Sequence, residues 1–154
     1  MIQEGDSVPE FSTKDANGDM VSSSDFEGRK HVIYFYPKDF TPGCTIQADE
    51  FSSEYKRFQD EGIEIVGVSP DGVDSHRKFC NKMGIQYPLL ADVDSKISKA
   101  FGVWGPKKFM GKEYTGVIRS TFLVDVNGKV FKTYPKVKPA GHAKLVLADF
   151  QSIK

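Results

Sequence analysis

The chain has 154 residues, a length typical of one domain, so we expect a single domain over residues 1–154. It carries 21 lysine and arginine residues against 21 aspartate and glutamate residues, a formal net charge of zero. This balance argues against nucleic-acid binding, which requires an excess or a stripe of basic residues. We also expect no membrane association, because no apolar run approaches the ~18 residues that span a bilayer.

Cysteine usage and the N-terminal residues indicate the compartment. Two cysteines are too few for a disulfide framework, the usual device of small secreted domains. Residues 1–6 lack the basic and apolar stretches with which a secretory signal begins. We therefore expect a cytoplasmic protein whose two thiols carry out local chemistry.

The chain opens with the signals of a hairpin and of a buried strand. Asn17-Gly18, between residues 11–13 and 20–21, predicts an antiparallel hairpin with a type I′ turn. Residues 31–36 (HVIYFY) are an almost unbroken run of β-branched and aromatic side chains, typical of a strand buried on both faces. Pro37 ends this run.

Further strands follow along the chain. Residues 63–69 form a second buried run, and residues 87–91 form a shorter one. Asn127-Gly128 predicts a hairpin between strands at residues 120–125 and 129–134. Between residues 102 and 116 the sequence is rich in glycine and lysine, and we expect an irregular connection there.

Apolar spacing, caps and stop signals predict four helices. They cover residues 41–60, 73–83, 94–102 and 140–153. Asp94 is the expected cap of the third helix, and Gly84 is the stop signal of the second. Strands that alternate with helices pair in parallel through right-handed crossovers, and the last hairpin adds antiparallel strands. The fold class is therefore α/β: a mixed central sheet with helices on both faces and an N-terminal hairpin.

Cys44 lies where the first buried strand passes into the first long helix. In α/β sheets this position, beyond the carboxyl end of a strand, is favoured for ligand sites. Thr41 is a good N-cap and Pro42 a good first helical residue, which puts Cys44 at the third helical position. There, unpaired N–H groups and the positive end of the helix dipole favour a thiolate.

Position alone leaves two interpretations of Cys44 open. The thiol faces the same way as the apolar side chains of its helix, and therefore into the core: Ala48, Phe51, Tyr55 and Phe58. A free cysteine in such a place is commonly a small buried hydrophobe. The helix start favours a reactive thiolate instead, which would need a cation and hydrogen-bond donors beside it.

Residues 36–45 (YPKDFTPGCT) resemble the peroxidatic motif of peroxiredoxins, whose core is Pro, three residues, Thr or Ser, two residues and Cys. The run FTPGCT within it is similar to that of the Q subfamily, the bacterioferritin comigratory protein-like peroxiredoxins. The similarity extends over nearly the whole chain and includes residues 65–69, 87–92, 102–105 and 119–122.

The resemblance implies a modified thioredoxin fold, in agreement with the element order above. It also implies a thiol peroxidase that reduces hydrogen peroxide and organic hydroperoxides. Cys44 would become a sulfenic acid, Thr41 would hydrogen-bond the peroxide and the thiolate, Arg119 would supply the cation, and Pro37 would shield the pocket. The family further implies a monomer and, as reductant, thioredoxin or a related dithiol. Without the resemblance, Arg119 would be interpreted as an exposed charge at a strand edge. Pro37 would be a strand terminator, a role that is compatible with shielding the pocket.

Cys80, in the second predicted helix, is the other thiol. Many Q-type relatives carry their resolving cysteine five positions after the peroxidatic one, where this chain has Asp49. Cys80 resembles the resolving cysteine of another branch, which implies a disulfide with Cys44. Because both thiols lie on apolar helix faces, and a disulfide needs Cα atoms within ~7 Å, we predict local unwinding around both. The alternative is that Cys80 is inert core and that an external thiol resolves the sulfenic acid.

The same residues leave other chemistries open. His76 and Cys80, four apart on one helix, could bind zinc together with Cys44, but no fourth ligand is evident. A disulfide reductase would need C-x-x-C, and the position after Cys44 that would complete it holds Gln47. A cysteine hydrolase would need a base from among His31, His76 and His142, of which we expect His142 on the surface at a helix start. A peroxide sensor that passes oxidation to a partner would use the same Cys44 sulfenic acid.

Overall fold

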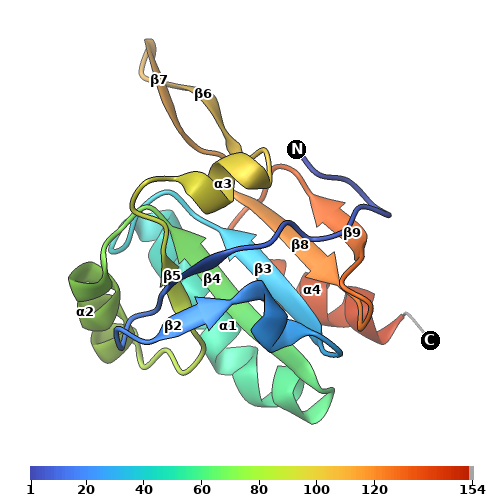
Figure 1. Cartoon of the computed structure of the whole chain (residues 1–154). Coiled ribbons are helices and arrows are strands. Elements are labelled where there is room, and N and C mark those ends of the chain that lie inside the picture. Colours follow the sequence, from blue (N-terminus) through green and yellow to red (C-terminus); the bar gives the residue numbers. More distant parts are fainter. Residues whose placement is uncertain (153–154) are drawn as a thin grey trace.

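A five-stranded mixed sheet forms the centre of the computed structural model, which describes residues 1–152 (Figure 1). The strands lie in the order β5-β4-β3-β8-β9. Neighbours are parallel from β5 to β3 and antiparallel from β3 to β9, as predicted. Their bounds are β3 Lys30–Phe35, β4 Ile63–Ser69, β5 Leu89–Ala91, β8 Ser120–Val124 and β9 Val130–Tyr134.

Two hydrophobic cores cover the two faces of this sheet, because successive side chains of a strand point to opposite sides. On β3, Val32 and Tyr34 belong to one core, and Ile33 and Phe35 belong to the other. The first core lies under α1 (Pro42–Asp60), α2 (Val73–Met83) and α4 (His142–Gln151). The second lies under α3 (Lys96–Ala100) and the N-terminal residues. The expectation of helices on both faces is confirmed.

The N-terminal hairpin is also confirmed, but its turn is not type I′. The hairpin pairs β1 (Ser12–Lys14) with β2 (Met20–Ser22), and a 3₁₀ turn, η1 (Ser23–Phe26), follows. A type I′ turn needs positive φ at both central residues, and here Gly18 has it but Asn17 does not. Asp15 instead closes a longer loop by accepting hydrogen bonds from the N–H groups of Asn17 and Gly18.

The segment expected to be irregular between residues 102 and 116 is a second hairpin. It pairs β6 (Trp104–Phe109) with β7 (Lys112–Val117) in antiparallel register and projects from the body of the molecule (Figure 1). Its turn has positive φ at both Met110 and Gly111, as a type I′ turn requires. The prediction was wrong because these strands pair only with each other, and the first four residues of β7 are all exposed rather than alternately buried, as a typical strand would be.

The helix bounds follow the predictions closely, with one change of cap. Ser95, not Asp94, is the N-cap residue of α3, and the carboxylate of Asp92 accepts hydrogen bonds from the N–H groups of Ile97 (3.0 Å) and Ser98 (2.9 Å). The predicted end of the last helix at residue 153 lies outside the described residues. Within residues 1–152, no helix is both long and apolar enough to cross a membrane.

Candidate active site

Cys44 occupies the position that the sequence predicts. Thr41 is the extended N-cap of α1, Pro42 is the first helical residue, and Cys44 is the third. The first backbone bond of the helix runs from the N–H of Thr45 to the carbonyl of Thr41 (2.9 Å). The N–H groups of Gly43 and Cys44 lie ahead of this bond, where they can stabilise an anion. The thiol is 1% exposed and belongs to the core on the helical side of the sheet.

Arg119, which lies between β7 and β8, brings its charge to this thiol. Its Nη2 lies 3.2 Å from Cys44 Sγ and donates to it, and its Nη1 donates to Oε1 of Gln47 at 2.7 Å. The planar guanidinium is therefore held at two points by side chains of the same helix. Gln47 has a buried amide, and sequence reasoning gave it no role in the site.

Thr41 and Pro37 border the same thiol-bearing helix start. The hydroxyl of Thr41 donates to the carbonyl of Lys38 at 2.8 Å, so its lone pairs remain free to accept a hydrogen bond. Pro37 follows β3 directly and is half-buried. Between them, Phe40 has a positive φ of 65°, and its ring packs edge-on against Phe79 of α2 with the centroids 5.0 Å apart. A strained residue next to a reactive group is typical of functional loops.

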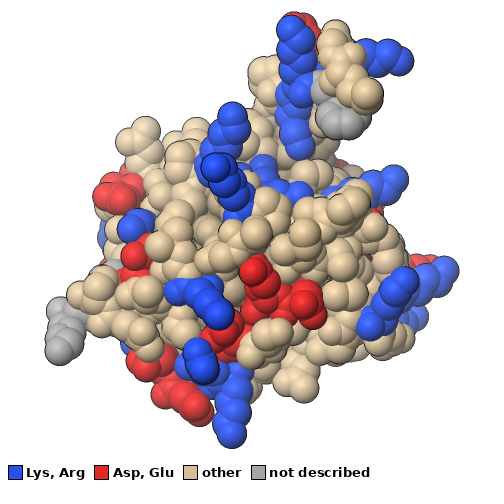
Figure 2. All heavy atoms as spheres, turned by 180° about the vertical axis from the view of Figure 1, so that it is seen from behind, with Lys and Arg blue, Asp and Glu red and all other residues tan. Residues whose placement is uncertain are grey.

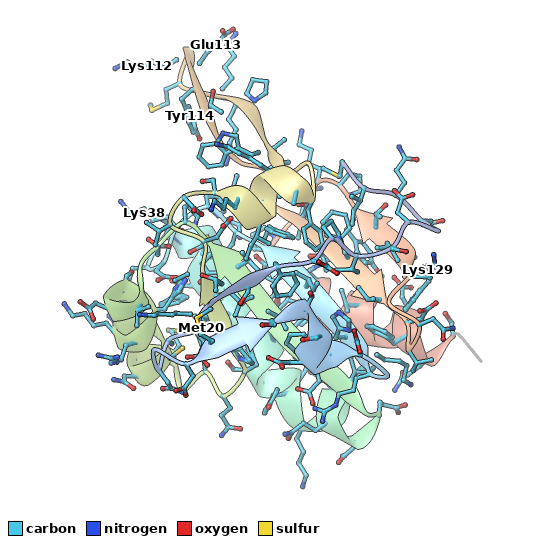
Figure 3. All side chains as sticks on the ribbon, in the orientation of Figure 1. Met20, Lys38, Lys112, Glu113, Tyr114 and Lys129 are labelled. Atoms are coloured by element: carbon cyan, nitrogen blue, oxygen red, sulfur yellow. The ribbon has the colours of Figure 1, made fainter. Side chains whose placement is uncertain are left out.

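A second cation lies close to Arg119. Lys107 on β6 is half-buried, and its Nζ donates to the carbonyl of Val117 at 2.7 Å. Burial, and after it the charge of Arg119, lower the pKa of Lys107, whereas the charge of Cys44 raises it. The hairpin that carries Lys107 projects from the same end of the molecule as Lys38 (Figure 3). From behind, Lys and Arg side chains are prominent on this hairpin and on the surface next to it (Figure 2).

Cys80 is a free, half-buried thiol on α2, and Cys44 is also free. Cys80 packs against the core that contains Cys44 and lines a small pocket of about 200 Å³ beside the β1–β2 turn. Burial, followed by the charges of Asp39 and Asp15, raises the pKa of Cys80 to about 11. The thiol is therefore weakly nucleophilic while α2 is folded. Asp49 is exposed on α1.

The three histidines serve packing and hydrogen bonding. His31 lies at the start of β3, at the opposite end of the strand from Cys44, with Nδ1 3.0 Å from the carbonyl of Arg29. Both ring nitrogens of His76 are engaged, with Asp39 (2.7 Å) and with the carbonyl of Leu90 (2.9 Å). The zinc arrangement considered above is thus not formed.

His142 is buried, which corrects the expectation of a surface position. Its ring lies edge-on to the rings of Tyr134 and Phe51, and its Nε2 is 2.9 Å from the hydroxyl of Thr121. It begins α4 as predicted, but the helix turns this first side chain toward the sheet. The position within the helix was readable from sequence, whereas the direction depended on how α4 packs on α1.

A buried thiol at a helix start, held beside a guanidinium at the carboxyl end of a thioredoxin-like sheet, defines a thiol-dependent oxidoreductase. Residues 4–133 match the AhpC/TSA family. Over 152 residues, covering 99% of this chain and 97% of the relative, the chain is 43% identical to peroxiredoxin Bcp of Bacillus subtilis.

Solved structures of Q-type and Bcp-type peroxiredoxins share the fold of this chain. PrxQ of Xylella fastidiosa superposes with a TM-score of 0.93 at 32% identity, covering 99% of this chain and 97% of that one. The bacterioferritin comigratory protein of Xanthomonas campestris, described by its alkyl peroxide reduction activity, gives a TM-score of 0.88 at 38% identity, covering 96% and 98%. The chain belongs to the AhpC/TSA family and, within it, is a peroxiredoxin of the Bcp or Q type, a thiol peroxidase.

Proposed function

We propose that this peroxiredoxin reduces hydrogen peroxide and organic hydroperoxides to water and alcohols through a sulfenic acid on Cys44. The observation that carries the proposal is the 3.2 Å contact between Nη2 of Arg119 and Sγ of Cys44. A fixed cation beside a buried sulfur stabilises the thiolate, and it remains in place as negative charge moves to the departing oxygen. The alkyl peroxide reduction activity of the Xanthomonas campestris relative supports organic hydroperoxides as substrates.

The first step is a displacement at oxygen. The Cys44 thiolate attacks one peroxide oxygen, an S–O bond forms and the O–O bond breaks. The second oxygen leaves as hydroxide or alkoxide and takes up a proton, so that sulfur is oxidised and the peroxide is reduced. The Thr41 hydroxyl donates its own hydrogen to the carbonyl of Lys38 and accepts a hydrogen bond from the attacked peroxide oxygen. Pro37 limits the access of water.

The second step forms a disulfide. The Cys80 thiolate attacks the sulfenic sulfur, an S–S bond forms, and the oxygen leaves with a proton as water. Because Cys44 is buried and Cys80 is half-buried on a different helix, the start of α1 and the part of α2 around Cys80 unwind before the sulfurs meet. Thioredoxin or a similar dithiol then reduces the disulfide. Both cysteines come from one chain, so a monomer completes the cycle.

The test is intact mass under non-reducing conditions after the reduced protein receives one equivalent of hydrogen peroxide. We expect the loss of two hydrogens in the wild type and not in Cys80→Ser, and no reaction in Cys44→Ser. A mass increase from added oxygen, with Cys80 still a free thiol, would mean that an external thiol resolves the sulfenic acid and that no intramolecular disulfide forms. An unchanged mass would overturn the peroxidase mechanism. Repeated turnover with a thioredoxin system would identify an enzyme, whereas a single stoichiometric oxidation would identify a peroxide sensor.

A further inference from the structure

A buried polar cluster joins the segment before α1 to the first turn of α2. Asp39 is 3% exposed and His76 is fully buried, and the two are 2.7 Å apart through Oδ2 and Nδ1. The other carboxylate oxygen accepts a hydrogen bond from Tyr36 (2.6 Å), and Ser75 donates to Oδ2 (2.8 Å). The peroxidase chemistry proposed above uses none of these side chains directly.

The hydrogen-bond partners of His76 indicate where the protons of this contact lie. Nε2 of His76 faces the carbonyl of Leu90, which can only accept, so Nε2 carries a proton. An unprotonated Nδ1 and a carboxylate would repel each other at 2.7 Å, so a second proton lies between Nδ1 and Asp39. Each of the two side chains thus depends on the other for a buried hydrogen bond.

The pair lies between the two cysteine segments. Asp39 is five residues before Cys44, and His76 is four residues, about one helical turn, before Cys80. Phe40, strained at a φ of 65°, adds an aromatic contact to α2 at the same place. The disulfide step requires both segments to unwind, and the Asp39–His76 pair is the fully buried polar contact between them.

We propose that Asp39 and His76 form a clamp that makes the two cysteine segments unwind together, and that the clamp sets the rate of disulfide formation. If one segment unwound alone, it would leave the partner's polar group buried and without its hydrogen bond at Asp39 Oδ2 or His76 Nδ1, which is costly. Release of both at once exposes both groups to water. Asp39 and His76 are therefore positioning residues for the disulfide step, and this inference rests on the proposed role of Cys80.

The clamp also keeps Cys80 unreactive before oxidation. The charge of Asp39 is the second cause, after burial, of the raised pKa of Cys80. When the clamp opens, α2 unwinds and Asp39 moves away with its own segment. Cys80 then loses its burial and the nearby charge of Asp39 together. Exposure and reactivity of Cys80 thus rise in the same event.

The first experiment measures disulfide formation by quenched-flow mass spectrometry in Asp39→Asn and His76→Asn. We expect the disulfide to form about tenfold faster, and less sulfinic acid to accumulate under excess peroxide, because resolution then outcompetes a second oxidation. Ser75→Ala, which removes one hydrogen bond to the same carboxylate, gives a milder change and a variant that retains the pair. Val130→Ala, in the core on the opposite face, is the control for general destabilisation. If the clamp variants resolve no faster than this control at matched loss of thermal stability, the proposal is overturned.

The second experiment tests the coupling without a disulfide. Iodoacetamide labelling is followed at Cys44 in the Cys80→Ser background and at Cys80 in the Cys44→Ser background. His76→Asn, a change in α2, should raise both labelling rates by a similar factor. Faster labelling of Cys80 alone would show that the segments open independently. If the wild type forms no disulfide, Cys80 is not the resolving cysteine. The labelling rates would still show whether the two segments open together.

Discussion

Gln47 accepts a 2.7 Å hydrogen bond from Nη1 of Arg119, and the other terminal nitrogen of that guanidinium donates to Cys44. Gln47 lies one helical turn after Cys44 on α1, so a single helix carries both the thiol and the group that orients its cation. The amide nitrogen of Gln47 is buried and has no hydrogen-bond partner among the described residues. The only hydrogen bond of this side chain among the described residues is therefore the one that its carbonyl oxygen accepts from Arg119.

Loss of this orientation should slow the reaction with peroxide. We expect Gln47→Leu to lower the second-order rate constant for oxidation of Cys44 about tenfold. The Arg119 guanidinium keeps its charge in this variant but is no longer held in position beside the Cys44 sulfur. Arg119→Ala, which removes the charge itself, should lower it by ~10²–10³. Competition kinetics for hydrogen peroxide measure both, with the exposed Arg29→Ala as control. Equal rates for Gln47→Leu and wild type would mean that Arg119 is oriented by other contacts.

Gly43 leaves little room for a side chain beside Arg119. A Cβ at this position would lie 3.1 Å from Nη2 of Arg119 and 3.3 Å from Cγ of Pro139. Gly43→Ala should therefore displace the guanidinium by a few tenths of an ångström and slow peroxide reduction several-fold. Thermal stability should hold or rise, since alanine is favoured over glycine in a helix by ~1 kcal/mol. A drop in melting temperature together with the rate would instead indicate a general packing defect.

Cys80 should react slowly in the folded, reduced protein. With its pKa raised to about 11 by burial and then by Asp39 and Asp15, little thiolate is present near neutral pH. In Cys44→Ser, iodoacetamide should label Cys80 at pH 8 at least about tenfold more slowly than in the same protein unfolded in urea, after allowance for nucleophilicity. Asp15→Asn should speed labelling modestly. Equal rates in folded and unfolded protein would contradict the burial of this thiol.

His142 should make the fold sensitive to mild acid. Burial lowers the pKa of His142 to about 4, against ~6.5 in an unfolded chain. The unfolded chain therefore binds the extra proton first, and stability is lost as pH falls from about 6.5 to about 4. The loss assigned to this group is on the order of 3 kcal/mol.

Urea unfolding of wild type and His142→Gln at pH 7 and pH 4.5 measures this contribution. The substitution removes the titrating ring and keeps a side-chain amide near the hydroxyl of Thr121. We expect the wild type to lose more stability than the variant on acidification, whichever is more stable at pH 7. Parallel losses would assign the acid sensitivity to the carboxylates.

Local signals predicted the elements that build the site. The apolar run that became β3 and the Thr41-Pro42 start of α1 depend on neighbouring residues alone, and both were confirmed. The β6–β7 hairpin could not be predicted in this way, because most of β7 is exposed and its turn, Met110-Gly111, is not a common hairpin pair. At α3 the first-turn N–H groups bond to the carboxylate of Asp92 rather than to that of the predicted cap Asp94, because the chain buries Asp92 where the helix starts.

By itself, the sequence determined the class of fold, the family resemblance and the placement of Cys44 at a helix start, since hydrophobic period, caps and motif spacing are local properties. The resemblance also implied Arg119 at that thiol, but only the tertiary structure decided which side chains orient Arg119 and which join the two cysteine segments. Arg119 and Gln47 are 72 residues apart and Asp39 and His76 are 37 apart, and each pair forms because the sheet order brings distant segments to one edge. Contacts of this kind depend on packing geometry, which no local pattern of residues encodes.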